Sequence, residues 1–221
     1  MIQTIQKLER SIKERRDVDI PFMNWWLFIL LVNPLTIGIY GFVMFFKRTG
    51  RVDNFIDRKN RYYQNLIDYT EKYAVEQSKY DDIKNDLDDL SSSVDDTFSK
   101  EIKPIKAWFS FFLMIVTLGI WAFVWLYKIN KVWYLLQKAE QDFDDGLSQI
   151  WEKLGLIKYP LDFNLDISKN RSFALYLFLS VVTLGIWMLV WDFKIHTDPE
   201  NLYKEFHSIE DTVLQIVRQN A

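Results

Sequence analysis

Three long apolar runs, almost free of charged residues, constrain this chain more than any other feature of its sequence. They cover roughly residues 22–46, 107–127 and 172–191, and the segments between them are rich in Asp, Glu, Lys and Arg. A helix that rises about 1.5 Å per residue needs about 20 residues to cross a hydrocarbon core of about 30 Å. The sequence therefore predicts an all-α integral membrane protein.

The three runs share one residue pattern. Residues 36–47, 117–128 and 183–194 each extend from a Thr to a Lys with the same spacing. Their common pattern, T-x-G-I-[YW]-x-[FL]-V-[MW]-x-[FY]-K, is far more specific than shared hydrophobicity and indicates internal duplication. The first copy differs in two ways, because Asn33-Pro34 precedes its Thr and Met44 replaces the second Trp.

This pattern resembles that of small bacterial membrane proteins of unknown function, which carry T-L-G-I-[YW] followed by an aromatic and Lys-rich exit from the membrane. The resemblance covers about a third of the chain, spread over the three copies. A weaker similarity connects the chain to the T-L-G-x-x-I-W stretch of the TM2 domain, whose glycine-rich companion motif is missing here. Neither resemblance implies a catalytic residue.

The Thr-x-Gly in the middle of each run permits two interpretations. Each run is either a single transmembrane helix, in which Gly and Thr are common, or a hairpin of two short helices that enters and leaves by the same face. In a hairpin, Gly supplies the backbone angles of the turn and Thr caps the outgoing helix. The predicted turn residues are Thr36, Gly38, Thr117, Gly119, Thr183 and Gly185.

Charge placement favours the hairpins. Basic residues lie at both borders of every run, and basic residues near a membrane border mark its cytoplasmic side. Three single spans would place half of these clusters on the opposite side, whereas hairpins keep them together. A hairpin has a cost, however, because its legs cross only about half the bilayer and its turn exposes backbone groups to lipid.

The outgoing half of each run places one Thr, two large residues and one Lys on a single helical face. This stripe is either a docking surface between repeats or protomers, or generic packing combined with anchoring at the membrane interface. Its members after the Thr are Tyr40, Met44, Lys47, Trp121, Trp125, Lys128, Trp187, Trp191 and Lys194. Asp192 is a possible intramembrane acid, a type of residue that suggests function, although Lys194 and the nearby border also allow it to snorkel.

The hydrophilic segments predict helices that form a cytoplasmic layer. Heptad-like periodicity predicts two helices that fold back on each other between the first two runs, with a helix N-cap at Ser91–Ser93. The N-terminal amphipathic helix either lies on the membrane surface or packs against the other helices. The predicted division is a basic N-terminal helix (1–21), membrane repeat 1 (22–47), a coiled-coil-like connection (48–105), membrane repeat 2 (106–128), a helical connection with a short irregular segment (129–171), membrane repeat 3 (172–195) and a C-terminal amphipathic helix (196–221).

Several function classes find no support in the sequence. A net charge of −3 argues against a nucleic-acid partner, and the absence of Cys excludes disulfides and thiolate chemistry. No nucleophile elbow, phosphate loop, dinucleotide fingerprint or zinc-protease motif occurs. We therefore expect no enzyme, and no catalytic, cofactor-binding or metal site.

The leading hypothesis is a non-enzymatic membrane scaffold in the bacterial cytoplasmic (inner) membrane. It would contact anionic lipid headgroups, assemble as a homo-oligomer through its helical layer and bend the bilayer with its re-entrant hairpins. The alternative is an oligomeric channel or transport component, or a regulatory subunit that binds another membrane protein.

Overall fold

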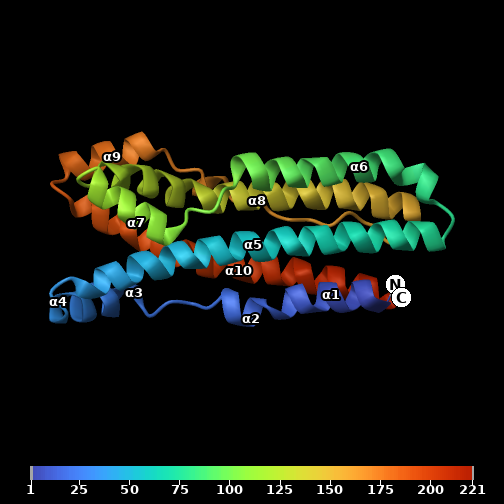
Figure 1. The fold of residues 1–221 in the computed structure, drawn as a ribbon, viewed down its shortest axis with the longest axis horizontal. Coiled ribbons are helices and arrows are strands. Elements are labelled where there is room, and N and C mark those ends of the chain that lie inside the picture. Colours follow the sequence, from blue (N-terminus) through green and yellow to red (C-terminus); the bar gives the residue numbers. More distant parts are fainter. Residues whose placement is uncertain (1, 221) are drawn as a thin grey trace.

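The computed structural model describes residues 2–220, which form helices and no strands. The prediction of an all-α protein is therefore confirmed. The molecule is an elongated bundle with three short helical hairpins gathered at one end, and the two chain ends lie together far from these hairpins (Figure 1).

Three long helices run from the hairpin end into the rest of the bundle. They are α5 (Ile39–Glu76), α8 (Ile120–Leu154) and α10 (Ile186–Gln219), and each begins directly after the glycine of a Thr-x-Gly motif. Each continues as one helix from its apolar first quarter into a hydrophilic segment, and Pro199 lies inside α10. The predicted borders after residues 47, 128 and 195 are thus changes of surface character along a helix and not helix ends.

A shorter incoming leg pairs with each long helix. The legs are α7 (Ala107–Val116), α9 (Phe173–Val182) and, in the first hairpin, the series α3 (Trp25–Leu27), the π-helical turn η1 (Phe28–Val32) and α4 (Asn33–Leu35). Every apolar run therefore reverses at its Thr-x-Gly, and the single-span interpretation is wrong. Among residues 2–220, no helix combines the length and the apolar character that crossing a bilayer requires.

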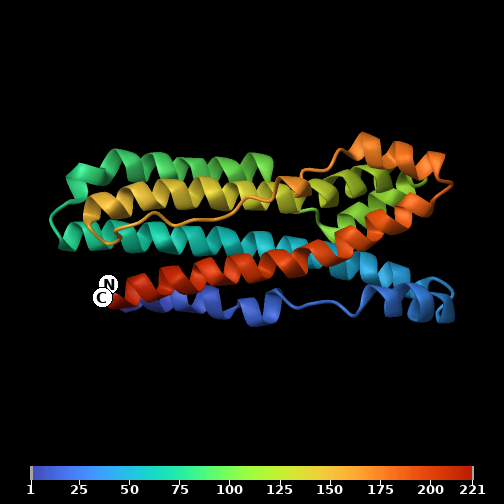
Figure 2. The same cartoon turned by 180° about the vertical axis from the view of Figure 1, so that it is seen from behind.

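The remaining helices pack along the long ones. α1 (Ile2–Lys13) and α2 (Arg15–Val18) lie against α5, and α1 also contacts α10. Leu8 of α1 is fully buried there, which agrees with packing on the bundle rather than with a position on the membrane surface. After the last turn of α8, residues 156–166 have no regular secondary structure and run back along the bundle to η3 (Ile167–Lys169) and α9 (Figure 2).

The fold corrects the predicted helix start at Ser91–Ser93. These serines lie inside α6 (Tyr80–Asp96), and the π-helical turn η2 (Thr97–Glu101) follows it. The helix continues through them because Leu87, Leu90 and Val94 extend its buried stripe across the serine run. The chain instead reverses between α5 and α6, where Ser78 has a positive φ of 57°.

The stripes of the hydrophilic helices form one shared core. Side chains of α1, α5, α6, α8 and α10 meet in a buried cluster that includes Leu66, Leu87, Leu147 and Val213. The stripes are thus used inside a single chain, as mutual packing predicts, and are not free for contact between subunits.

A buried ion network joins three helices near the middle of the bundle. Arg58 donates to both carboxylate oxygens of Glu210 at 2.9 Å and to Asp19 at 2.8 Å, while Lys59 donates to Glu140 at 2.8 Å. All of these side chains are fully buried. Burial raises the pKa of Glu140, and Lys59 acts in the opposite direction. Removing one member of such a network leaves an uncompensated buried charge, so the network fixes the register of the long helices.

Candidate functional site

The three hairpin turns have the same backbone conformation. Gly38, Gly119 and Gly185 have φ values of 80°, 91° and 92°, in the left-handed region that glycine adopts without a steric penalty. The residue before each glycine also has a positive φ, of 51° at Ile37, 48° at Leu118 and 49° at Leu184. Two successive left-handed residues reverse the chain, so the predicted role of the glycines agrees with the geometry.

The turns satisfy their own backbone donors. In the second hairpin, Gly119 N donates to Met114 O at 2.7 Å, and Leu118 N and Ile120 N donate to Ile115 O and Thr117 O at 3.1 Å. The equivalent bonds of the first and third turns have nearly the same lengths. A turn in lipid is costly when its backbone N–H groups are left without partners. In these turns local hydrogen bonds largely remove that cost.

The threonines complete this satisfaction. Each Thr hydroxyl donates to the carbonyl four residues earlier and accepts a backbone N–H four residues later, from Tyr40 at 3.1 Å and from Trp121 and Trp187 at 2.9 Å. The hydroxyl thus links the end of the incoming helix to the start of the outgoing one. This is the capping role that the sequence predicted for Thr36, Thr117 and Thr183.

The turns also present apolar side chains to the outside. Ile37, Leu118 and Leu184 are 91%, 94% and 94% exposed, and the isoleucines after the glycines are about equally exposed at 68–69%. Exposed apolar residues continue down the legs, among them Leu30, Leu35, Trp108, Phe112 and Phe178. Apolar side chains exposed together in this way are uncommon on soluble monomers and are typical of surfaces that contact lipid or another protein.

One lysine follows each turn at the same distance along its outgoing helix. Lys47, Lys128 and Lys194 each follow their turn glycine by nine residues, a helical distance of about 14 Å. Lys47 and Lys128 lie 5.8 and 5.9 Å from the ring centroids of Tyr40 and Trp121 on the same helical faces. The repeat therefore sets three cations at one height along the bundle.

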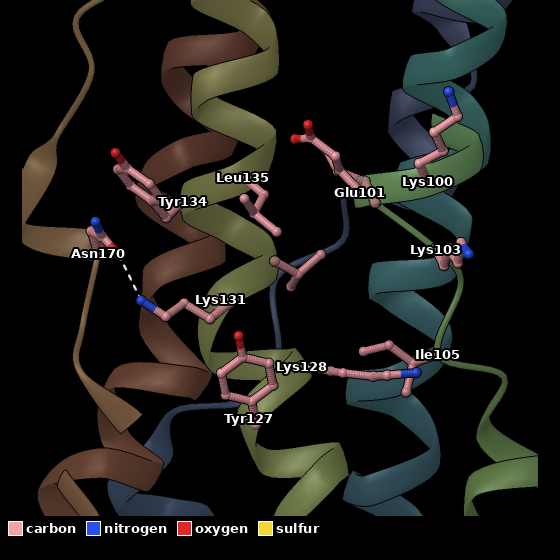
Figure 3. A pocket seen from close by; sticks show the side chains of 12 residues that line it. Lys100, Glu101, Lys103, Ile105, Tyr127, Lys128, Lys131, Tyr134, Leu135 and Asn170 are labelled. Carbon is pink, nitrogen blue, oxygen red and sulfur yellow. Dashed lines mark hydrogen bonds between the residues drawn. The ribbon is translucent and has the colours of Figure 1, made fainter. Parts of the chain in front are cut away.

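A cavity of about 450 Å³ opens between α8 and the segment before α7 at this height. Figure 3 shows Tyr127, Lys128 and Lys131 on one wall and Lys100, Lys103 and Ile105 on the other. Lys131 donates to Asn170 at 2.6 Å, and Lys100 pairs with Asp96 at 2.7 Å. With Glu101 as the single acid of its lining, the cavity carries a net positive charge.

Two tryptophans of the predicted stripe contact a neighbouring repeat. Trp125 donates from its indole to Thr49 of α5 at 2.9 Å, and Trp191 donates to Asn130 of α8 at 3.0 Å. The equivalent Met44 is buried against Trp25 and Phe28 of its own hairpin. At Trp125 and Trp191 the stripe is thus a contact between repeats of one chain. Trp187, whose indole nitrogen has no hydrogen-bond partner among residues 2–220, lies against Tyr176 of α9, the incoming leg of its own hairpin.

Asp192 ties the third hairpin to the first. Its carboxylate accepts both terminal nitrogens of Arg48 and the indole N–H of Trp25, the latter at 2.7 Å. Arg48 also donates to Nδ1 of His196 at 3.2 Å, and His196 Nε2 lies 2.8 Å from the Met23 carbonyl. A carbonyl only accepts, so Nε2 carries a proton. A guanidinium only donates, so Nδ1 is unprotonated and the ring is neutral. The acid that the sequence singled out is therefore an ion-paired bridge between repeats.

Sequence reasoning missed the residues at the tips and the partner of Asp192. Ile37, Leu118 and Leu184 occupy the variable position between the Thr and the Gly of the motif. The prediction therefore rested on the invariant Thr and Gly and assigned no role to the residue between them. Arg48 was assigned only to a basic border cluster. The sequence did contain a signal for this ion pair. Asp192 is an acid at a position where the other two copies of the repeat have the apolar residues Phe45 and Leu126.

Comparison with known proteins does not assign this chain to a family. No family model, no curated protein and no solved structure matches this chain. Within residues 2–220, no group of three or more His, Asp or Glu side chains is arranged to hold a metal ion.

Proposed function

We propose that this chain is a non-enzymatic membrane scaffold whose three hairpins insert into one leaflet of a bilayer, with the long-helix bundle outside it. The observation that carries the proposal is the near-complete exposure of Ile37, Leu118 and Leu184 at equivalent turns on the same end of the molecule. A chain that folds in water would bury such residues, and their repetition argues for a common environment.

The dimensions of the hairpins support shallow insertion. Legs of 10 residues, as in α7 and α9, are about 15 Å long, which is half of a hydrocarbon core of about 30 Å. With the turns near the bilayer midplane, Lys47, Lys128 and Lys194 lie at the level where the core meets anionic headgroups. Internally bonded turns lower the cost of placing a chain reversal in lipid.

One-sided insertion provides a mechanism for shaping membranes. Three hairpins occupy area in one leaflet and none in the other, so the occupied leaflet expands. Assembly into a homo-oligomer would add these effects together. Because the stripes of the long helices are buried within the chain, such an assembly would use other surfaces, such as the sides of the hairpins.

The alternative, a channel or transport component, has less support. The serine and threonine hydroxyls of the apolar end are engaged locally, since Ser110 and Ser180 donate to carbonyls four or five residues earlier and the threonines cap the turns. A regulatory subunit of a larger membrane complex remains compatible with the same insertion, and a stoichiometric partner in the purified protein would favour it.

The test is membrane retention of a tip variant. We expect the wild-type protein to stay with vesicles at alkaline pH, whereas the double variant Leu118→Asp/Leu184→Asp is extracted, because each charge costs about 2.5–3.5 kcal/mol at the bilayer centre. Val75→Asp is the matched control, because Val75 is 57% exposed at the opposite end of the bundle. Equal retention of the double variant and the control would contradict insertion of the tips.

A further inference from the structure

The guanidinium of Arg51 lacks a counter-ion. Its side chain is only 6% exposed, it forms no ion pair with any carboxylate of residues 2–220, and Nε and Nη1 have no hydrogen-bond partner. Nη2 donates to the His196 carbonyl at 3.3 Å, and the group lies 3.5 Å from the Phe22 ring centroid. Burial lowers the pKa of Arg51 to about 10, so the side chain is still charged at neutral pH.

The two acids that act electrostatically on Arg51, Asp19 and Glu200, both bond to other groups, and neither pairs with Arg51. Asp19 accepts from Arg58 and lies 2.6 Å from His207, and Glu200 accepts the backbone N–H of Phe22 at 3.1 Å. A buried charge without a partner is costly. The arrangement therefore has room for an anion that the chain itself does not supply.

A cavity of about 500 Å³ provides that room. Arg51 lines it together with Lys47, Gly50 and Asn54, and its lining includes no carboxylate. Its remaining wall is apolar and extends toward the hairpin turn through Phe46, Met44 and Tyr40. The cavity thus has two basic side chains on one part of its lining and an apolar wall that follows the first hairpin.

This cavity differs from the lysine-lined cavity beside α8 (Figure 3). There Glu101 lies in the lining, and Lys100 and Lys131 already have polar partners. Around Arg51 the positive charge is buried and forms no ion pair within the described part of the chain. The cavity beside the first hairpin is therefore the one of the two in which a buried cation lacks a paired acid.

We propose that this cavity binds the phosphate of an anionic glycerophospholipid, with Arg51 and Lys47 as its ligands and the wall formed by Tyr40, Met44 and Phe46 against the adjoining acyl chain. The inference rests on the proposed membrane insertion, which places Lys47 at headgroup level. Guanidinium and ammonium groups bind phosphate through charge-assisted hydrogen bonds. The apolar wall favours a lipid over free phosphate, which has no apolar part to cover it.

The experiment measures which lipids stay with the full-length protein. The protein is reconstituted in phosphatidylcholine vesicles with a small fraction of phosphatidylglycerol, purified in mild detergent, and its retained lipids are quantified by mass spectrometry. We expect phosphatidylglycerol to be enriched over phosphatidylcholine, and the enrichment to fall about tenfold in Arg51→Gln and in Lys47→Gln. Lys47→Gln alters an exposed side chain, so it tests the site even if Arg51→Gln folds poorly.

Lys128→Gln is the matched control, because Lys128 holds the same position in the second repeat and does not line this cavity. Its enrichment should equal that of the wild type. No enrichment in the wild type, or the same enrichment in all variants, would overturn the site.

A second arm separates the two sources of phosphate. Inorganic phosphate and glycerol 1-phosphate are added to the lipid-loaded protein in neutral detergent, and we expect neither to displace the lipid at millimolar concentration. Displacement that depends on Lys47 would overturn the lipid assignment in favour of free phosphate. Retention in pure phosphatidylcholine vesicles is measured in parallel, so a failure of membrane insertion is distinguished from a failure of headgroup preference.

Discussion

Gly38, Gly119 and Gly185 show how single residues determine the hairpins. Their left-handed conformation is uncrowded, since nothing lies within 4 Å of a Cβ built on any of them, so an added side chain would be resisted by backbone strain alone. The neighbouring Ile37, Leu118 and Leu184 already accept that strain while their side chains pack on nothing. A strained, exposed apolar residue at the same place in every repeat is understandable if that residue acts outside the fold.

Replacing a turn glycine isolates this effect. We expect Gly119→Ala to lower the free energy of unfolding by about 1–2 kcal/mol, the cost of a left-handed conformation for an L-residue. Gly50→Ala is the matched control, because Gly50 lies inside α5 with open space at its Cβ position, and alanine should stabilise it by about 0.5–1 kcal/mol. Chemical or thermal unfolding in detergent measures both, and equal effects in the same direction would contradict the role of the turn.

At the scale of secondary-structure elements, an ion pair and hydrogen bonds join the first and third hairpins. Arg48 of α5 contacts Asp192 and His196 of α10, and His196 in turn reaches the segment before α3 through Met23. The bridge holds the incoming leg of one hairpin against the outgoing helix of another. It depends on a neutral imidazole, because Nδ1 must accept from a guanidinium.

This dependence predicts a loss of stability at acidic pH. Burial, assisted by Arg48 and Arg51, lowers the pKa of His196 below its ordinary value of about 6.5. Between these two pKa values the unfolded chain binds more protons, so stability falls as the pH decreases below about 6.5. In His196→Gln this part of the pH dependence should disappear, and His207, present in both proteins, serves as an internal control. Identical slopes of unfolding free energy against pH between 7 and 5 would refute the assignment.

For the whole molecule, the hairpins direct every connection to the same side. The segments before, between and after the apolar runs all belong to one bundle (Figures 1 and 2). This arrangement leads to a topology test that requires no knowledge of activity.

The chain has no cysteine, so single cysteines can report on sidedness. We expect cysteines at the exposed positions Gln3, Gln77, Lys158 and Asn201 to react with an impermeant maleimide only after cells are permeabilised, whereas a cysteine at Leu118 is shielded by lipid in both states. Gln77 and Lys158 lie in different connections, before and after the second hairpin. Opposite accessibility at these two positions would exclude re-entrant hairpins.

Much of this fold follows from local sequence patterns. The Thr-x-Gly turns, the caps and the helical connections depend on neighbouring residues, so the repeat predicted them. The predicted helix start at residues 91–93 was wrong because the burial of Leu87 and Val94, a tertiary effect, outweighed the capping propensity of the serines. The Asp192 bridge and the unpaired Arg51 depend on contacts across more than a hundred residues, which a single sequence does not encode in its periodicity.

The unbroken course of α5, α8 and α10 has a mechanical consequence. Each is one helix of about 50–57 Å whose first quarter belongs to a hairpin, and no turn or loop separates its apolar part from its hydrophilic part. If the hairpins insert as we propose, a tilt imposed on them would move the far end of the bundle sideways. The distal end would then move in proportion to the slope of the membrane that holds the tips.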